Sequence, residues 1–350
     1  MGAGHVFYCT LHNKVLMGKD KKFLKVLVTG GAGYIGSVTT AALIEENHTV
    51  TVLDDLSSGH LQAVHPEAHF VKGDISDSNV IESICRDGID VAMHFAAFIK
   101  VEESVADPSK YYGNNLAKTL HFLDNLRLSG VHNIVFSSTA AVYGEPECIP
   151  LTESSPLRPV NPYGWTKMMV EQLLRDYDQA FGLKSVSLRY FNAAGAYNRY
   201  GEDHRSESHL IPRILNAASG GASLQVYGID YGTQDGSCIR DFVHVKDLAD
   251  AHVLAAQHLC TGGSSDCFNL GTGKGFSILE VIGSVEKVVG RRIDYRIAKR
   301  RKGDSAVLVA SPQKAQCMLG WRKQFSTLEE IIESAWKWKR ENPTGYIERL

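Results

Sequence analysis

Residues 25–36 read Lys-Val-Leu-Val-Thr-Gly-Gly-Ala-Gly-Tyr-Ile-Gly, and this stretch determines the fold that we predict. Its apolar start, residues 25–29, is typical of a buried strand, and apolar residues at helical spacing follow over residues 34–46. The glycines between them are spaced G-x-x-G-x-x-G. In a strand–turn–helix context, such glycines permit a tight turn and let a pyrophosphate approach the backbone at the helix N-terminus. The sequence therefore predicts a dinucleotide-binding turn that contains Gly30, Gly33, Tyr34, Ile35 and Gly36.

The same alternation of strand and helix continues along the first half of the chain. Further strands are predicted at residues 49–53, 70–71, 90–95, 133–138 and 185–189, with helices at residues 116–128 and 167–181. Strands that alternate with helices form a parallel sheet with helices on both faces. We therefore predict an α/β protein with a Rossmann-type, doubly wound domain over residues 23–191.

A smaller α/β lobe, interleaved with the first domain, is predicted over residues 192–350. Loops rich in glycine and tyrosine begin there, and helical patterns cover residues 210–218 and 245–259. Two more helices begin with the capping boxes Ser277-x-x-Glu280 and Thr327-x-x-Glu330. Residues 267–270 read as a strand that returns to the first sheet, whereas residues 1–22 are expected to form a disordered N-terminal extension without a role in function.

The composition argues against several classes of protein. Of the 350 residues, 44% are hydrophobic and 22% are charged, as in folded globular proteins. With 37 basic and 39 acidic residues and no long run of one charge, neither a nucleic-acid partner nor a membrane partner is expected. The seven cysteines lack C-x-x-C spacing, and no apolar run approaches the ~18 residues of a membrane span. We therefore expect a cytoplasmic protein with reduced thiols and without a metal site.

Two aspartates follow predicted strands where a dinucleotide would lie. Asp54 comes 18 residues after Gly36, where a carboxylate accepts hydrogen bonds from the adenosine ribose. Because a carboxylate repels a 2′-phosphate, this residue favours NAD over NADP. Asp74 is expected to bind the adenine amino group. For each residue the alternative is an aspartate that only caps a turn.

A second group of residues has the chemistry of proton transfer. Tyr163 and Lys167 are four residues apart at the start of a predicted helix, so their side chains share one face. A free tyrosine has a pKa of about 10, which a nearby ammonium and an oxidised nicotinamide ring would lower. Thr139, at the carboxyl end of a predicted strand, is placed to pass a proton between Tyr163 and a substrate oxygen. On its own, the Tyr–Lys spacing is more often that of a solvated helix face.

Together these motifs resemble the extended short-chain dehydrogenase/reductase superfamily, on residues 29–36, 137–144 and 163–167. Five further segments are similar to one family within it, the UDP-glucose 4-epimerases: residues 188–196, 228–236, 239–245, 269–273 and 300–304. The resemblance runs from about Lys25 to Trp338, which is nearly the whole chain beyond the extension.

The resemblance implies a homodimer that binds NAD tightly and epimerises UDP-glucose and UDP-galactose at C4 through a 4-keto sugar. Tyr163 would remove the proton of the 4-hydroxyl, with Lys167 and Thr139 as its catalytic partners. NAD would be bound by the glycine-turn residues named above and by Asp54, Asp55, Asp74, Ile75, Phe95, Ala96, Ala97, Asn115, Ser138, Tyr163, Lys167 and Tyr190. The UDP-sugar would be bound by Thr139, Tyr163, Asn192, His209, Leu210, Tyr227, Arg240, Arg301, Asp304 and Leu308.

Departures from family patterns bear on the substrate and on the reaction. Leu308 stands where a tyrosine occurs in members restricted to non-acetylated sugars, so the N-acetylated UDP-sugars are expected as further substrates. The related dehydratases carry an Asp–Glu pair after the strand-end threonine, whereas this chain has Ala140 and Ala141. A dehydratase or decarboxylase is therefore the less favoured alternative. The remaining alternative, a non-catalytic NAD sensor, does not need Tyr163 and Lys167.

Overall fold

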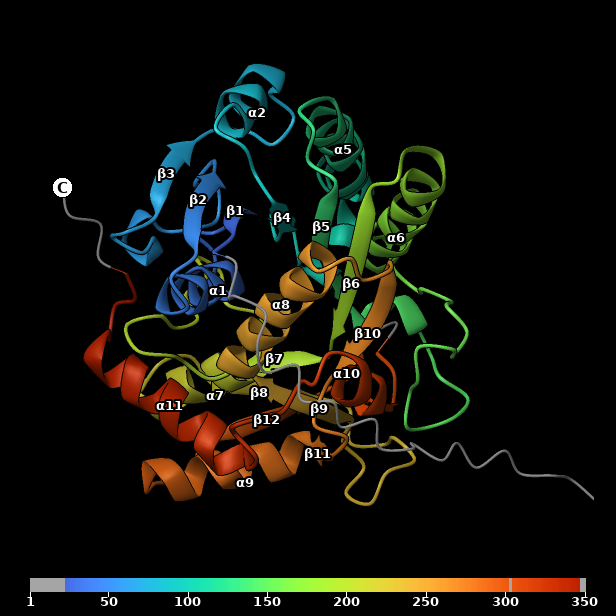
Figure 1. Ribbon diagram of the computed structural model, residues 1–350. Helices are drawn as coiled ribbons and strands as arrows, with labels where there is room; N and C mark the ends of the chain where they lie inside the picture. Colours follow the sequence, from blue (N-terminus) through green and yellow to red (C-terminus); the bar gives the residue numbers. More distant parts are fainter. Residues whose placement is uncertain (1–22, 302–303, 347–350) are drawn as a thin grey trace, which may run out of the picture.

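The computed structural model describes residues 23–301 and 304–346 (Figure 1). The predicted N-terminal extension, residues 1–22, lies outside the described residues. Within them, no helix is long and apolar enough to span a membrane.

The first domain is built on a parallel sheet of seven strands, ordered β10-β6-β5-β4-β1-β2-β3. Its strands are β1 (Lys25–Thr29), β2 (Thr49–Asp54), β3 (His69–Lys72), β4 (Val91–His94), β5 (Asn133–Thr139), β6 (Lys184–Tyr190) and β10 (Asp266–Leu270). The strand order reverses beside β1, so the carboxyl ends of β1 and β4 border the crevice in which such sheets bind ligands.

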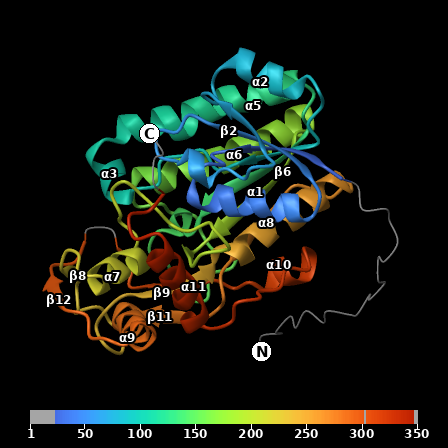
Figure 2. The same cartoon turned by 90° about the vertical axis from the view of Figure 1, so that its left-hand side faces the viewer.

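Helices cover both faces of this sheet, which explains the continuous apolar character of its strands. One face packs against α1 (Tyr34–Glu45) and α8 (Val245–Cys260), and the other against α2 (Ser78–Cys85), α5 (Lys118–Leu128) and α6 (Pro162–Phe181). Figure 2 shows the sheet between these two layers. The predicted helix at residues 116–128 is preceded by a π-helical turn, η2 (Tyr112–Ala117), which continues the short helices α3 (Val101–Ala106) and α4 (Pro108–Tyr111).

The second lobe lies below the sheet in Figure 1 and has its own apolar core. Its strand β9 (Ile239–His244) pairs with β7 (Asn192–Ala194), β11 (Gly275–Ser277) and β13 (Val307–Leu308), while β8 (Leu224–Tyr227) pairs with β12 (Tyr295–Ala298). The surrounding helices are α7 (Leu210–Ala218), α9 (Ile278–Val289) and α11 (Leu328–Glu341), whereas α10 (Gln313–Met318) packs against β10 of the first sheet. Both predicted capping boxes are formed, at Ser277 and at Thr327.

The two parts exchange segments, as the sequence predicted. After β9 the chain returns to the first domain as α8, which packs against α1, and then as β10, which pairs with β6. The α/β fold with a doubly wound sheet and an interleaved second lobe is therefore confirmed. Because β6 leads directly into β7, the carboxyl end of the first sheet opens toward the second lobe.

Candidate functional site

The turn after β1 has the backbone geometry that a bound pyrophosphate requires. Gly30 has a φ of +74°, and a Cβ atom there would lie 2.6 Å from the backbone nitrogen of Ala96. A Cβ on Gly36 would lie 2.3 Å from the carbonyl oxygen of Gly30. Gly33 caps α1 without a side-chain hydrogen bond to the first helical N–H groups. The turn is therefore closely packed on its protein side, and the helix N-terminus presents donors and a positive dipole end to an anion.

Asp54 ends β2 beside this turn and is held in a fixed orientation. Its carboxylate accepts hydrogen bonds from the backbone N–H of Ala32 at 3.0 Å and of Leu56 at 2.8 Å. Burial raises the pKa of Asp54, and these two bonds partly offset the effect. Asp55 is exposed and accepts from the backbone of Ser57 at 2.8 Å. An acid thus stands at the strand end next to the glycine turn, as an NAD-binding sheet requires.

The other predicted cofactor residues border the same edge of the sheet. The Asp74 carboxylate pairs with Lys118 and accepts from Ser76. Burial alone would raise the pKa of Asp74, but these bonds outweigh it and lower the pKa. Asn115 bonds the N–H of Phe98 at 2.8 Å and its carbonyl at 2.9 Å, which fixes the segment that follows β4. That segment contains Phe95, Ala96 and Ala97, and the nearby Ile75 is buried.

Tyr163 lies in the first turn of α6, across from the end of β5. Asn161 caps this helix by accepting from the N–H of Gly164 at 2.9 Å, and Pro162 occupies the first helical position. Thr139 ends β5, and its hydroxyl is hydrogen-bonded to the Tyr163 phenol. Burial raises the pKa of Tyr163, and the bond with Thr139 acts in the opposite direction. This direction differs from the lowered value that the sequence argument expected, because desolvation of the phenolate outweighs the protein's own stabilising groups.

Lys167 follows one helical turn later and is almost completely buried. Its ammonium donates to the carbonyl oxygen of Ser137 at 2.8 Å and lies 4.9 Å from the centre of the Phe136 ring. Burial lowers the pKa of Lys167 to about 7, and the carboxylate of Glu171 partly offsets this effect. The cation is thus held under the end of β5, on the same helix face as Tyr163.

The second lobe contributes polar residues that face the open end of the sheet. Arg240 in β9 donates to the carbonyl of Ser305 at 2.9 Å and lies 3.6 Å from a carboxylate oxygen of Asp304. The Arg301 guanidinium stacks on the Tyr227 ring, and the distance from the Arg301 Cζ atom to the ring centre is 3.9 Å. Leu308 pairs with Arg240 in the β13–β9 ladder. Five predicted substrate residues are therefore gathered around β9, from segments up to 81 residues apart in the chain.

The remaining predicted substrate residues lie on the connection between the lobes. Asn192 begins β7. Only Phe191 separates it from Tyr190, the last residue of β6. His209 caps α7 and Leu210 begins it. The His209 imidazole pairs with the Glu202 carboxylate; burial would lower the pKa of His209, but Glu202 outweighs burial and raises it to about 9. Tyr34, which follows the glycine turn, donates to the carbonyl of Gly195 at 2.6 Å and so ties this connection to the cofactor turn.

Comparison with known proteins agrees with this geometry. Residues 26–271 match the model of the NAD dependent epimerase/dehydratase family. The chain belongs to this family. A UDP-glucose 4-epimerase of Halalkalibacterium halodurans is 50% identical over 327 residues, which cover 92% of this chain and 98% of the relative. A UDP-glucose 4-epimerase of Lactobacillus helveticus is 48% identical and covers 93% of this chain and 100% of the relative. The solved UDP-glucose 4-epimerase of Brucella ovis, in complex with NAD, has a TM-score of 0.87 at 45% identity, covering 90% of this chain and 98% of that chain.

The structure also contains a buried network of hydrogen bonds that the sequence analysis missed. The Glu171 carboxylate accepts from Arg189 Nε at 2.9 Å and from Arg189 Nη2 at 2.5 Å, and from the Ser138 hydroxyl at 2.6 Å. Arg189 also donates to the Tyr143 hydroxyl, which donates to the Asn269 side chain at 2.6 Å. The sequence contained one signal for this network, because Glu171 stands four residues after Lys167 on the same helix face.

The structure changes the interpretation of two predicted residues, Ser138 and Arg240. The Ser138 hydroxyl is engaged inside the protein by Glu171, so a contact with the cofactor would have to use its backbone. Arg240 does not pair with its neighbour Asp241, which was the structural alternative for it. The buried Asp241 carboxylate instead accepts from the backbone and hydroxyl of Thr272 and from the N–H of Gly273. The Arg240 guanidinium is therefore oriented by Asp304 and by the carbonyl of Ser305.

Proposed function

We infer that the protein interconverts UDP-glucose and UDP-galactose by inverting the configuration at C4 through a 4-keto intermediate. The observation that carries this inference is the pairing of Tyr163 with Thr139 above the buried Lys167, next to the glycine turn. Gly30, Gly33, Gly36 and Asp54 would hold NAD, which when bound supplies the acceptor and donor of a hydride at C4. The enzyme is an isomerase, because the proton that Tyr163 removes and the hydride that NAD would accept are both returned to the same sugar.

Tyr163 acts first as a base and then as an acid toward the sugar 4-hydroxyl. Burial keeps the phenol protonated, so a positive charge is needed beside it before the proton can leave. Lys167 supplies one such charge when it is protonated, and the oxidised nicotinamide ring would supply another. Thr139 orients the phenol through its hydrogen bond and contacts the same sugar oxygen.

The second lobe would bind the UDP part of the substrate and leave the sugar free to turn. Arg240 and Arg301 suit a diphosphate, because guanidinium groups bind phosphate oxygens in a fixed planar geometry. Asp304 orients Arg240. The remaining contacts of this proposal come from Asn192, His209, Leu210 and Tyr227.

Related dehydratases eliminate water from the sugar, which requires an acid and a base. This chain has alanines at the two positions where those enzymes carry them. Ala140 and Ala141 follow Thr139 in the turn η3 (Ala140–Tyr143), and neither side chain can transfer a proton. A sensor of NAD would not need Tyr163 bonded to Thr139 over a buried lysine. Both alternatives are therefore less well supported than epimerisation.

The direct test follows UDP-galactose conversion by purified protein, with the bound nucleotide identified after denaturation. We expect UDP-glucose as the product and NAD in the denatured supernatant. A protein that retains NAD but leaves UDP-galactose unchanged would be a sensor, and release of a 4-keto-6-deoxy sugar would identify a dehydratase.

We also propose that UDP-N-acetylglucosamine and UDP-N-acetylgalactosamine are substrates. Leu308 packs against the cluster formed by Ala140, Tyr143 and Phe191, which places it between β9 and the turn that follows Thr139. A tyrosine there would occupy volume beside the sugar 2-position, and packed pockets resist overfilling by about 1–3 kcal/mol. Leu308→Tyr should suppress conversion of UDP-N-acetylglucosamine and spare UDP-glucose. Failure of the parent enzyme to convert the acetylated sugar at saturation would refute the argument from Leu308.

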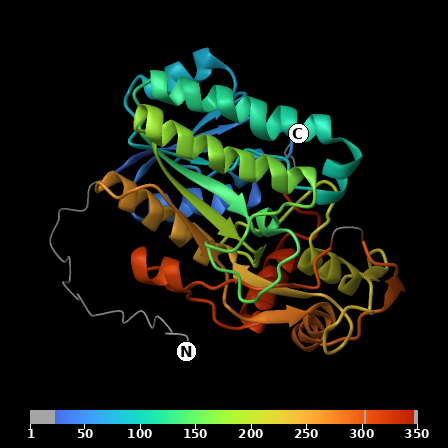
Figure 3. The same cartoon turned by 90° about the vertical axis from the view of Figure 1, so that its right-hand side faces the viewer.

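A homodimer is proposed from the outer face of the first domain. The helices α5 and α6 lie side by side there, as Figure 3 shows in teal and yellow-green. They expose the large apolar side chains of Leu120, Leu128, Trp165 and Phe181. Exposed apolar groups on one face mark protein interfaces. Sedimentation equilibrium should give twice the chain mass, and a charged residue in place of Phe181 should shift the protein toward the monomer.

A further inference from the structure

Four potential metal ligands converge on the connection between β7 and α7. Glu202, His204, Glu207 and His209 each offer one ligand atom, and these four atoms lie within 4.8 Å of one another. The His204 Nε2 atom lies 3.2 Å from a carboxylate oxygen of Glu202, and the His209 Nδ1 atom contacts that same oxygen. One oxygen of Glu207 accepts from the backbone N–H of His209 at 2.7 Å, so its second oxygen remains for a ligand.

Imidazole and carboxylate are both ligands that zinc accepts. Two imidazoles and two carboxylates bind Zn²⁺ at about 2.0–2.2 Å, which places the donors of a tetrahedral site about 3.4 Å apart. The Glu202–His204 separation is already close to this value, and the largest separation in the group requires only small side-chain movements. Two carboxylate charges also balance one divalent cation.

We propose that Glu202, His204, Glu207 and His209 form a binding site for one divalent transition-metal ion of the zinc class. Their convergence resembles a coordination sphere more than a set of separate pairs. In the part of the chain that the structure describes, no second group of three or more such side chains comes together in this way. The spacing E-x-H-x-x-E-x-H places all four donors on one short loop.

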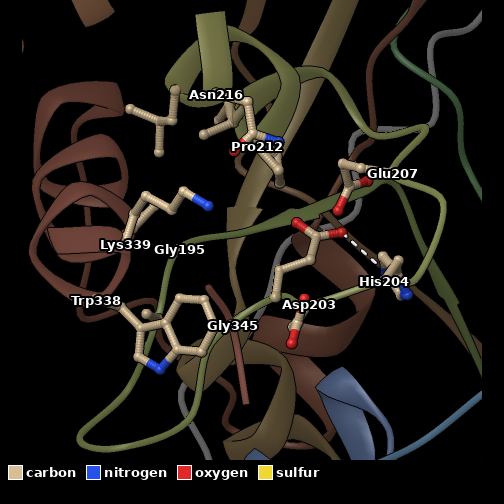
Figure 4. Close-up of a pocket in the computed structure, with 14 residues that line it drawn as sticks. Gly195, Asp203, His204, Glu207, Pro212, Asn216, Trp338, Lys339 and Gly345 are labelled. Carbon is tan, nitrogen blue, oxygen red and sulfur yellow. Dashed lines mark hydrogen bonds and ion pairs between the residues drawn. The ribbon is translucent and has the colours of Figure 1, made fainter. Parts of the chain in front are cut away.

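A cavity gives an ion access to this group. It is lined by Glu202, His204 and Glu207 together with Asp203, and offers about 60 Å³ of space to water, where one water needs about 10–15 Å³. Figure 4 shows His204 and Glu207 on one wall of this cavity and Lys339 of α11 entering from another. The Lys339 ammonium is bonded to the carbonyl of Pro343 at 3.1 Å. An ion can therefore reach the cluster with part of its hydration shell.

The alternative to a metal ion is two glutamate–histidine ion pairs. That account explains Glu202, which contacts both imidazoles. It leaves out Glu207, whose carboxylate lies within 4.8 Å of the Glu202 carboxylate in this partly buried group, where like charges repel each other. A cation held among all four donors relieves this repulsion and uses every ligand.

Binding of a metal ion at this site would affect catalysis, and this consequence rests on the proposed function. His209 is also expected to contact the UDP-sugar, and coordination would hold its Nδ1 atom at the ion. A bound ion should therefore raise the KM for UDP-galactose without abolishing turnover. Metal binding itself is measured independently of activity, so failure of this proposal and failure of the epimerase assignment are distinguishable.

The experiment titrates the chelator-treated full-length protein with Co²⁺ and follows the visible absorption of the metal. We expect one tight equivalent with the bands of a tetrahedral nitrogen–oxygen site, displaced by one equivalent of Zn²⁺. His204→Ala should lose this binding. Glu207→Gln, which preserves side-chain volume, should lose it too while its circular dichroism stays unchanged. His69→Ala, which removes an exposed histidine on β3, is the matched control and should bind as the parent does.

Three outcomes would overturn the proposal. The first is that the parent protein does not bind Co²⁺ stoichiometrically, and the second is that the parent and His204→Ala bind it equally. The third is a thiolate-to-cobalt charge-transfer band in the absorption spectrum. The last outcome would assign the ion to cysteine, of which six are free thiols within the described residues.

Discussion

The buried pair of Glu171 and Arg189 allows a quantitative test of how the site is supported. Both side chains are at most 2% exposed, and two hydrogen bonds of 2.9 and 2.5 Å join them. Arg189→Met would leave the Glu171 carboxylate buried with Ser138 as its remaining donor. Glu171→Met would leave the guanidinium with only Tyr143 and a long contact to the Glu153 carbonyl. Removing one partner of a buried pair costs about 3–5 kcal/mol, because the other charge stays uncompensated.

The double variant removes both charges and should recover most of this loss. Its remaining cost comes from the Ser138 hydroxyl without an acceptor, about 1–3 kcal/mol, and from Lys167, which loses the nearby Glu171 carboxylate; the sum for the two single variants is about 6–10 kcal/mol. Equilibrium urea unfolding of nucleotide-free protein measures the free energy of unfolding for all four members of the cycle. A double variant less stable than either single variant would refute the reasoning, since no uncompensated charge would then explain the single losses.

Three further outcomes follow from the site and the core. Tyr163→Phe should retain NAD and UDP-sugar binding but lose most turnover, because it removes the proton-transfer group and little volume; near-parent turnover would contradict this mechanism. Asp54→Ala should weaken NAD retention and reduce discrimination against NADP, measured as nucleotide content after denaturation. Burial lowers the pKa of His94 to about 3 and the pKa values of His244 and His252 to about 4. In the folded protein these histidines therefore stay neutral at pH values below about 6.5, where the same residues of the unfolded chain become protonated. The free energy of unfolding should therefore fall as pH decreases from about 6.5 to 4, by up to about 1.4 kcal/mol per pH unit for each histidine, and a flat profile there would contradict the burial argument.

The fold was predictable because its signals are local. The strand, glycine turn and helix over residues 25–45 are contiguous, and each later strand of the first sheet contains a short apolar run. The short strands of the second lobe were not predicted. The return of β10 to the first sheet was also predicted, from the apolar residues 267–270. The π-helical turn at Tyr112–Ala117 was not, because its sequence pattern does not differ from that of an ordinary helix.

The sequence identifies candidate site residues but not how their side chains pair. Tyr163 and Lys167 share a helix, so their spacing alone places them together. Arg240 pairs with Asp304, 64 positions away, and not with the adjacent Asp241, because neighbours in a strand point to opposite faces. The contact of Ser138 with Glu171 depends on how α6 packs against β5, which no local pattern specifies. Sequence spacing thus identifies donors and acceptors within one element, whereas pairs between elements need the packed structure.

The electrostatics of the site suggest why proton transfer follows the state of the cofactor. Burial raises the pKa of Tyr163 and lowers that of Lys167 to about 7, so near neutral pH the protein's own groups favour a neutral phenol beside a partly charged ammonium. In the proposed mechanism, Tyr163 would therefore act as a base only while an additional positive charge, such as that of an oxidised nicotinamide ring, lies nearby. Without that charge, burial would favour the protonated phenol, which is the state that can return a proton to the sugar. The proposed role of Tyr163 needs both protonation states in one turnover, and a change in the charge of the bound cofactor would switch between them without a change in the protein's conformation.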